Sequence, residues 1–257
     1  MLNWPEHADD DTPILTAAAL LAQRWRTSRA PQITPPQTII IGYQRDVRAA
    51  LLKRYRAVKV AGFLGELHVL KTRGQSIGVL QPSGPGAPLM AAAVEELIAF
   101  GVQRFIAIGV AGGLQPELQC GDIVMCDRAL RDEGTSYHYL PPARSVEAQA
   151  ALVQQLSEVL AAQHIAHSCG TSWTTDAPYR ELRRQVEACR AEGVKTVEME
   201  TAALFAVGQC LKVPTAAVLV IGDRLADLVW QPPGNRQAVQ HSLAAVAQAI
   251  VAQLKTE

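Results

Sequence analysis

Residues 194–223 read VKTVEMETAALFAVGQCLKVPTAAVLVIGD, and this stretch contains the pattern that decides the fold. A short β-branched run leads into the acidic cluster Glu198-Met199-Glu200, and the apolar run TAAVLVI is followed by a glycine and Asp223. Because TAAVLVI shows no polar alternation, we predict a strand that is buried on both faces of an α/β sheet. The carboxylates therefore lie at or just beyond strand ends, where open α/β sheets place ligand sites.

Between these two features the sequence predicts a helix over residues 201–212. It begins at Thr201 and carries Ala, Leu and Phe at helical spacing, and Pro214 follows its end. The carboxylates also allow a structural interpretation, in which the two glutamates form a surface acid pair and Asp223 caps the segment DRLADL. The pattern alone leaves both interpretations open.

The composition favours one domain with a large buried core. The chain has 257 residues, of which 49% are apolar and 19% are charged, and no linker divides it. Lys+Arg and Asp+Glu both number 24, so the formal net charge is +0 and gives no indication of nucleic-acid or membrane binding. We therefore expect a protein that binds neither nucleic acid nor membranes, and a neutral chain this rich in apolar residues is a candidate for a homo-oligomer.

The cysteines and the N-terminus indicate a cytoplasmic protein. The five cysteines are odd in number and scattered without a CxxC pair, which argues against a disulfide framework and against a zinc site. The apolar run ILTAAALLA follows acidic residues and is too short to span a bilayer, so it fits neither a secretory signal nor a membrane helix. Thr12 and Pro13 instead predict the N-cap and first position of an amphipathic helix that extends to about Arg26.

The remaining elements alternate between strands and helices. We predict a strand from Thr38 to Ile41, a hairpin over 62–81, a strand over 104–109, a helix from Ser145 to Gln163 and a closing helix from Gln237 to Lys255. This order predicts an α/β fold with a single three-layer αβα domain and a mostly parallel, mixed central sheet. Residues 1–37 form the expected N-terminal helix and lead-in, and residues 38–257 form the domain.

The segment VEMETAALFAV resembles the signature of the nucleoside phosphorylase and nucleosidase superfamily, whose members break the N-glycosidic bond of nucleosides. The segments GVAGGLQ, GDIV and RDEGTSYHY resemble other motifs of the family in the same order, and the resemblance covers roughly residues 38–227. It implies that Glu200 accepts hydrogen bonds from the ribose hydroxyls, with Glu198 and Met199 beside it in the substrate site.

The same resemblance implies that Asp223 acts on the base. Purine-specific branches of the family end this strand in Ser-Asp, whereas this chain reads Gly222-Asp223. The Asp is therefore kept and the Ser is not.

The resemblance places phosphate near two glycine-containing loops. Family members have Gly-Asp-Pro-x-Arg after the first strand, and this chain keeps Gly42 but carries Arg45 one position before the Arg slot. The loop PSGPGAPL resembles the family pattern Gly-x-Gly-x-Pro-Ser, in which Gly84 and Gly86 allow backbone N–H groups to approach an anion at a helix N-terminus. We expect these four residues to bind phosphate, and the alternative is an ordinary strand-to-helix turn with a solvated Arg45.

Two residues depart from the family pattern where phosphate is held. Relatives show Arg-x-Gly-(Ser/Thr)-x-Gly here, and Gly109 and Gly112 match and are expected to line the substrate site. The Arg slot contains Ala107 and the Ser/Thr slot contains Val110. The hydrolytic branch of the superfamily also lacks this Arg, so the departure leaves attack by water open.

The candidates for the base-binding end come from two loops. The loop RDEGTSYHYLPP resembles the uridine phosphorylase branch, and His138 is its candidate substrate contact. The Phe that stacks on the base in relatives falls on Pro178, so stacking passes to Trp173 or Tyr179. The uridine branch reads the pyrimidine carbonyls with an Arg near Arg184. A structural histidine and a solvated arginine are the alternatives.

The family chemistry is cleavage of a ribose–base bond through an oxocarbenium-like sugar. Glu200 and Asp223 are the expected catalytic residues, phosphate is the expected co-substrate, and neither a metal nor a cofactor is expected. The RDEGTSYHY loop favours phosphorolysis to free base and ribose 1-phosphate. A nucleoside hydrolase and a non-catalytic nucleoside-binding protein are the alternatives, and the sequence leaves open both the base, purine or pyrimidine, and the assembly, dimer or hexamer.

Overall fold

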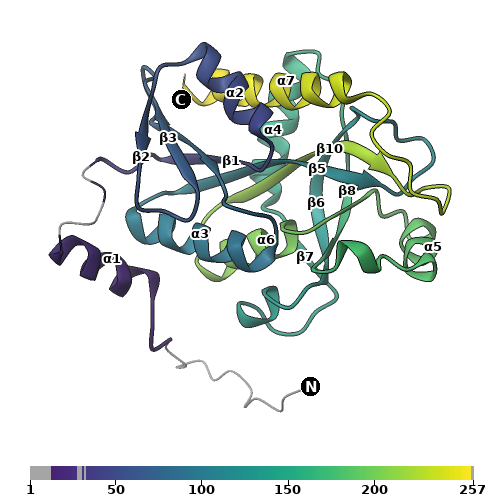
Figure 1. Ribbon diagram of the computed structural model, residues 1–257, viewed down its shortest axis with the longest axis horizontal. Helices are drawn as coiled ribbons and strands as arrows, with labels where there is room; N and C mark the ends of the chain where they lie inside the picture. Colours follow the sequence, from purple (N-terminus) through teal and green to yellow (C-terminus); the bar gives the residue numbers. More distant parts are fainter. Residues whose placement is uncertain (1–12, 28–30, 32, 256–257) are drawn as a thin grey trace.

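The computed structural model describes residues 13–27, 31 and 33–255 (Figure 1). Helix α1 (Ala17–Arg26) begins later than the sequence predicts, because the Thr16 side chain caps it by accepting a hydrogen bond from the Ala19 N–H at 3.1 Å. Pro13 therefore precedes the helix, and Thr12 lies outside the described residues.

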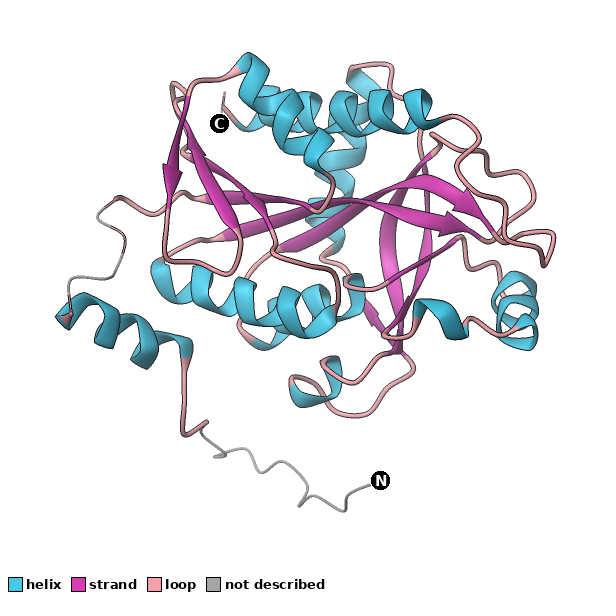
Figure 2. Cartoon of the chain, in the orientation of Figure 1, coloured by secondary structure: helices cyan, strands magenta, loops and turns pink. Residues whose placement is uncertain are grey.

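The strands of the described residues form one mixed sheet, which crosses the middle of the molecule (Figures 1 and 2). They are β1 (Thr38–Gly42), β2 (Ala57–Val60), β3 (Glu66–Leu70), β4 (Ile77–Gln81), β5 (Arg104–Gly113), β6 (Ile123–Asp132), β7 (Ser145–Glu147), β8 (Ser168–Thr175), β9 (Thr196–Glu198) and β10 (Thr215–Arg224). Their order is β10-β6-β8-β9-β5-β1-β4-β3-β2, with β7 beside β6. The sheet is parallel around β1 and β5 and antiparallel through β2, β3 and β4.

Part of the sheet closes on itself. Strand β10 pairs with β5 as well as with β6, so β5, β10, β6, β8 and β9 form a ring. On its other edge β5 changes partner, because its pairing with β1 ends at Ile108 and its pairing with β9 begins at Gly112. On this edge, the β5 residues between Ile108 and Gly112 pair with neither β1 nor β9. The edge therefore has a gap between the ends of these two strands.

Helices cover both faces of the sheet (Figure 2). They are α2 (Arg45–Arg54), α3 (Ala87–Phe100), α4 (Ala150–Ala162), α5 (Arg183–Ala191), α6 (Thr201–Cys210) and α7 (Arg236–Leu254), with 3₁₀ turns η1 (Ser136–His138) and η2 (Pro178–Arg180). Side chains of α2, α4 and α7 share one buried cluster with Ile106, and side chains of α3 and α6 share another with Ala107. Because successive strand residues face opposite sides, β5 contributes to both cores. The predicted α/β fold with a mixed central sheet is confirmed.

Two predicted helix boundaries are wrong and one element is confirmed. Residues 145–147 form β7 rather than a helical turn, because Val146 pairs with Ala129 of β6, and α4 begins only at Ala150. Helix α6 ends at Cys210, two residues early. The predicted hairpin is present as β3 and β4, which pair in antiparallel fashion. None of the helices in the described part of the chain is long and apolar enough to cross a membrane.

Candidate functional site

The candidate site lies where β5 changes partner from β1 to β9. Tyr43 and Gln44 follow the end of β1, and Glu198 to Glu200 end β9 and precede α6. Gly109 lies on β5 between them, and the Oε1 atom of Gln44 is 4.0 Å from the position that a Cβ atom at Gly109 would occupy. The ends of two strands therefore face each other across a stretch of β5 that carries no bulky side chain at this position.

The carboxylate of Glu198 holds the turn between β9 and α6. Its Oε2 accepts hydrogen bonds from the backbone N–H groups of Glu200 and Thr201, both at 2.7 Å. Its Oε1 accepts from the hydroxyls of Thr174 at 2.6 Å and Ser172 at 3.3 Å. The side chain is buried and both oxygens are engaged, so Glu198 lies beneath the candidate site as its support. Met199 is half-buried beside it.

Glu200 occupies the N-cap position of α6 and turns its side chain toward α3. Its Oε1 accepts a hydrogen bond of 2.6 Å from the backbone N–H of Gly86, at the amino end of α3. Gly86 has φ 111°, a left-handed conformation that glycine adopts without strain. The loop predicted to bind phosphate thus presents one of its N–H groups to Glu200.

Glu198 and Glu200 are close enough that a negative charge on one disfavours ionisation of the other. Burial raises the pKa of Glu200 to about 8, and the charge of Glu198 adds to the rise. Burial also raises the pKa of Glu198, while its hydrogen-bond donors lower it. Because Glu198 has four donors and Glu200 has only the backbone N–H groups of Gly86 and Met199, the charge is better stabilised on Glu198. Glu200 therefore keeps its proton at neutral pH.

Tyr43 and Gln44 bring two polar atoms to the site that the sequence patterns gave no reason to select. The Tyr43 hydroxyl and the Gln44 Oε1 are buried and have no hydrogen-bond partner within the described residues. Burial raises the pKa of Tyr43, and the charges of Glu200 and Glu198 add to the rise, which places this hydroxyl near both carboxylates. A buried polar group without a partner costs about 1–3 kcal/mol.

Val110 on β5 and Gly222 on β10 both depart from the family pattern, and the two residues pack directly against each other. A Cβ atom at Gly222 would lie 2.8 Å from the Val110 Cγ1, so Val110 requires a glycine at the position where purine-specific relatives carry Ser. Ala107 is buried in the core between β5 and the α3–α6 layer. Arg45 is exposed on α2. Gly42 packs against Val47, where a Cβ atom would be 2.7 Å away.

Asp223 lies across β5 from the two glutamates. Gly112 pairs with Val197 of β9 on one side and with Asp223 of β10 on the other. Neighbouring strands are about 4.8 Å apart, so the backbones of Val197 and Asp223 are separated by about 10 Å. The Asp223 Oδ2 accepts a hydrogen bond of 2.6 Å from the Trp230 Nε1. Residues 225–228 form a turn, so the interpretation of Asp223 as a helix cap is wrong.

Glu181 joins Asp223 and was missed by the sequence patterns. Burial raises the pKa of Glu181 to about 7, and the negative charge of Asp223 adds to the rise. The segment that carries Glu181 packs beside the turn after β10, because Arg183 donates a 3.4 Å hydrogen bond from its guanidinium to the Leu228 carbonyl. The end of β10 thus has two carboxyl groups near each other, and the negative charge of Asp223 disfavours ionisation of Glu181.

Trp173 does not lie in the site, contrary to the sequence prediction. Its side chain is 3% exposed in a cluster with Leu114, Val186 and Val197, and its Nε1 donates to the Asp132 Oδ2 at 2.9 Å. The ring therefore has no free face for a base. The sequence could not reveal this, because the cluster joins residues from four separate segments.

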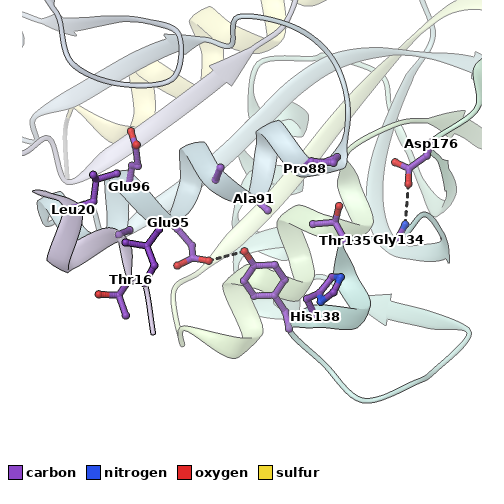
Figure 3. A pocket seen from close by; sticks show the side chains of 14 residues that line it. Thr16, Leu20, Pro88, Ala91, Glu95, Glu96, Gly134, Thr135, His138 and Asp176 are labelled. Atoms are coloured by element: carbon purple, nitrogen blue, oxygen red, sulfur yellow. Dashed lines mark hydrogen bonds between the residues drawn. The ribbon is translucent and has the colours of Figure 1, made fainter. Parts of the chain in front are cut away.

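The other base-end candidates are on the surface of this chain. Tyr179 is 98% exposed on η2, and Arg184 is exposed on α5. His138 is exposed on η1 and lines a cavity of about 660 Å³ between α1, α3 and η1. Figure 3 shows His138 and Thr135 across this cavity from Thr16. Neither Glu200 nor Asp223 lines it, whereas Pro88, at the amino end of α3, does.

The loop that carries His138 is held by its own contacts. The Arg131 guanidinium is buried, donates to the Ser136 hydroxyl at 2.8 Å and to the Pro141 carbonyl at 2.8 Å, and lies 4.3 Å from the centre of the Tyr137 ring. The Gly134 N–H donates to the Asp176 Oδ2 at 2.9 Å, as Figure 3 also shows. These contacts give the loop a fixed shape.

No group of three or more His, Cys, Asp or Glu side chains suited to a metal ion occurs within the described ranges. The five cysteines are free.

Sequence similarity to known proteins covers most of the chain. The family model described as the phosphorylase superfamily matches residues 38–254. A uridine phosphorylase of Treponema pallidum is 34% identical over 154 residues, which are 55% of this chain and 60% of that protein. A guanosine phosphorylase of Halorubrum lacusprofundi is 30% identical over 147 residues, or 56% of this chain and 59% of that protein. The match thus spans about three fifths of either relative.

The fold comparison extends further along the chain. A crystal structure of uridine phosphorylase from Vibrio fischeri superposes with a TM-score of 0.76 and 25% sequence identity, and the match covers 88% of this chain and 94% of that one. The similarity therefore includes nearly all of the sheet and its two helix layers.

The raised pKa of Glu200 predicts a pH-dependent stability. Between about pH 4.5 and pH 8 the unfolded chain loses the Glu200 proton and the folded chain keeps it, so the free energy of unfolding falls as the pH rises through this window. Glu200→Gln should flatten this fall by more than about 1.4 kcal/mol, the value of a tenfold change in proton affinity. Urea unfolding at a series of pH values measures the effect.

The control for this experiment is Glu158→Gln, on the exposed face of α4. Its profile should run parallel to that of the unmodified protein. A Glu200→Gln profile that also runs parallel would mean that Glu200 is ionised at neutral pH.

Proposed function

Because the chain belongs to the phosphorylase superfamily, we propose that it cleaves the N-glycosidic bond of a nucleoside with phosphate as the attacking group. The observation that carries this proposal is the row Val197–Gly112–Asp223 across three strands. With the Glu200 turn and the Asp223 carboxylate on opposite sides of β5, a nucleoside between them would direct its ribose to Glu200 and its base to Asp223. Phosphate is the co-substrate, and the proposal includes no metal and no cofactor.

At the sugar end, Glu200 accepts hydrogen bonds from the ribose hydroxyls. These bonds strengthen as positive charge develops on the sugar, so they stabilise the transition state more than the bound substrate. Glu198 holds the Glu200 backbone N–H and thereby fixes the direction of this side chain. To accept from the sugar, Glu200 gives up its proton and turns from the Gly86 N–H.

At the phosphate end, this rotation of the Glu200 side chain frees the backbone N–H of Gly86 at the amino end of α3. The Gly86 N–H, together with Gly84 and Gly42, then faces the phosphate, because N–H groups at a helix N-terminus favour anions. Arg45 is exposed at the start of α2, shortly after Gly42 in the chain, and contributes positive charge to this end of the site. A phosphate oxygen attacks C1′, the C1′–N bond breaks, and its electron pair leaves with the base.

At the base end, Asp223 and Glu181 receive the leaving base. One of the two carboxyl groups accepts a hydrogen bond from the base and the other donates one to it, and the raised pKa of Glu181 supplies the proton. Uracil and the 6-oxopurines present a ring N–H next to a carbonyl, which matches this pair. The proton of the pair then neutralises the charge that develops on the base. We therefore propose uridine-type or guanosine-type nucleosides as substrates, and the names of the uridine and guanosine phosphorylase relatives support this class.

We also propose a homo-oligomer, either a dimer or a hexamer. Tyr179, Val229 and Trp230 are large exposed side chains near the base end, and their exposed fractions are 98%, 64% and 62%. Apolar and aromatic side chains gathered next to a ligand site are suited to burial by a second copy of the chain.

Product analysis tests the proposed function directly. Uridine, guanosine, adenosine and cytidine are incubated with the protein in the presence and absence of phosphate, and base and sugar products are separated. We expect base release from uridine or guanosine only when phosphate is present, with ribose 1-phosphate as the second product. Free ribose formed at the same rate without phosphate would establish hydrolysis. If no nucleoside releases its base, the result would favour a non-catalytic nucleoside-binding protein.

Asp223→Asn tests the base end. The amide keeps an oxygen that accepts the Trp230 N–H but cannot take part in proton transfer to the base, so turnover of the best nucleoside should fall about a hundredfold, the scale of a general acid. The thermal midpoint should be nearly unchanged. The matched control is Asp227→Asn, because Asp227 lies nearby and bonds only to Gln231 in the described residues. Full activity of Asp223→Asn would exclude its role as an acid.

A further inference from the structure

The end of β1 carries two polar side chains whose hydrogen-bonding capacity the fold leaves unused. Gln44 is the N-cap residue of α2, yet its side chain makes no capping hydrogen bond. Its Oε1 is buried beside Gly109 without a partner in the described residues. The Tyr43 hydroxyl is equally buried and equally without a partner there.

These two groups face the position from which a nucleophile must approach. Gly42 is the last residue of β1 that pairs with β5, so Tyr43 and Gln44 occupy the edge of β5 between β1 and β9. Tyr43 also packs against the core cluster that contains Ala202 and Leu204 of α6, on the side of Glu200. The sugar-binding carboxylate and the two unused groups thus border the same opening.

Strand β5, which borders this opening, offers no side-chain donor at the two positions where family members carry one. Ala107 and Val110 take the places of the Arg and the Ser or Thr, and Val110 packs against Gly222. An oxyanion at this end still requires donors, because a buried charge without hydrogen bonds is strongly disfavoured. The backbone N–H of Gly86 is one such donor, and the β1 side carries the side-chain donors that β5 lacks.

We propose that Tyr43 and Gln44 hold the attacking phosphate in place of the missing basic and hydroxyl side chains. The Tyr43 hydroxyl donates to one phosphate oxygen. The Gln44 amide, turned so that its Nε2 takes the place of Oε1, donates to another, which orients a third oxygen toward C1′. The assignment rests on the proposed phosphorolysis. Both groups are uncharged, so they donate to the phosphate without forming an ion pair with Glu200 or Glu198.

Kinetics with varied phosphate test the assignment. Tyr43→Phe removes only the hydroxyl and should raise the KM for phosphate about tenfold or more, the loss of one hydrogen bond to a charged group. The KM for the nucleoside should be nearly unchanged. The thermal midpoint should stay the same or rise, because a buried group without a partner is removed. Gln44→Leu should show the same pattern.

Tyr55→Phe is the matched control. The Tyr55 hydroxyl is also buried without a partner in the described residues, but it packs against the core on the opposite face of the sheet. This variant should keep the phosphate KM of the unmodified protein. An unchanged phosphate KM in Tyr43→Phe, or a rise in the nucleoside KM alone, would overturn the assignment, and so would a fall in thermal midpoint that accounts for the lost activity.

Phosphate binding provides a second readout that is independent of catalysis. Phosphate should raise the thermal midpoint of the unmodified protein and of Tyr55→Phe, and it should raise that of Tyr43→Phe far less. An equal rise in all three proteins contradicts the assignment. Base release without any need for phosphate instead contradicts the proposed function, so the two failures are distinguishable.

Discussion

The buried carboxylate of Glu198 is the interaction on which the candidate site depends. It fixes the turn into α6 by accepting from the backbone N–H groups of Glu200 and Thr201, and it joins this turn to β8 through Thr174. The same negative charge raises the pKa of Glu200 to about 8. One side chain therefore supports the helix, directs Glu200 and controls its proton. A buried charge is stable here because donors surround it.

The sheet supplies the second constraint. The change of partner along β5 opens the edge between Ile108 and Gly112, and the ring places β10 on the other side of the same strand. Gly112 has no room for a side chain, because a Cβ atom would lie 2.7 Å from Leu225 and 3.0 Å from Val197. The Leu225 and Val197 side chains therefore fill the space next to Gly112, and the carboxyl groups on its two sides are held apart.

The sequence predicted the features that depend on local pattern. The apolar run after Pro214 and the acidic cluster before Thr201 placed Glu200 and Asp223 at strand ends, because strand and helix signals lie within a few residues of these side chains. Other features depend on contacts between distant segments. The Gly86 N–H bonds to Glu200, which is 114 residues away, and Trp173 is buried by strands and helices from other parts of the chain. No local pattern records such contacts. For the same reason the positions of Tyr43, Gln44 and Glu181, on which their proposed roles rest, emerged only from the structure, and Ser145 formed a strand where its neighbours suggested a helix.

We infer that Glu200 is protonated in the free protein and ionises when it accepts the ribose hydroxyls. Calorimetric titration with a nucleoside in phosphate-free solution near pH 7, repeated in buffers of different ionisation enthalpy, measures the protons exchanged on binding. We expect release of close to one proton per nucleoside bound by the unmodified protein and none by Glu200→Gln, because burial and the charge of Glu198 hold that proton until the sugar arrives. Nucleoside binding without proton release by the unmodified protein would mean that Glu200 is already ionised in the free protein.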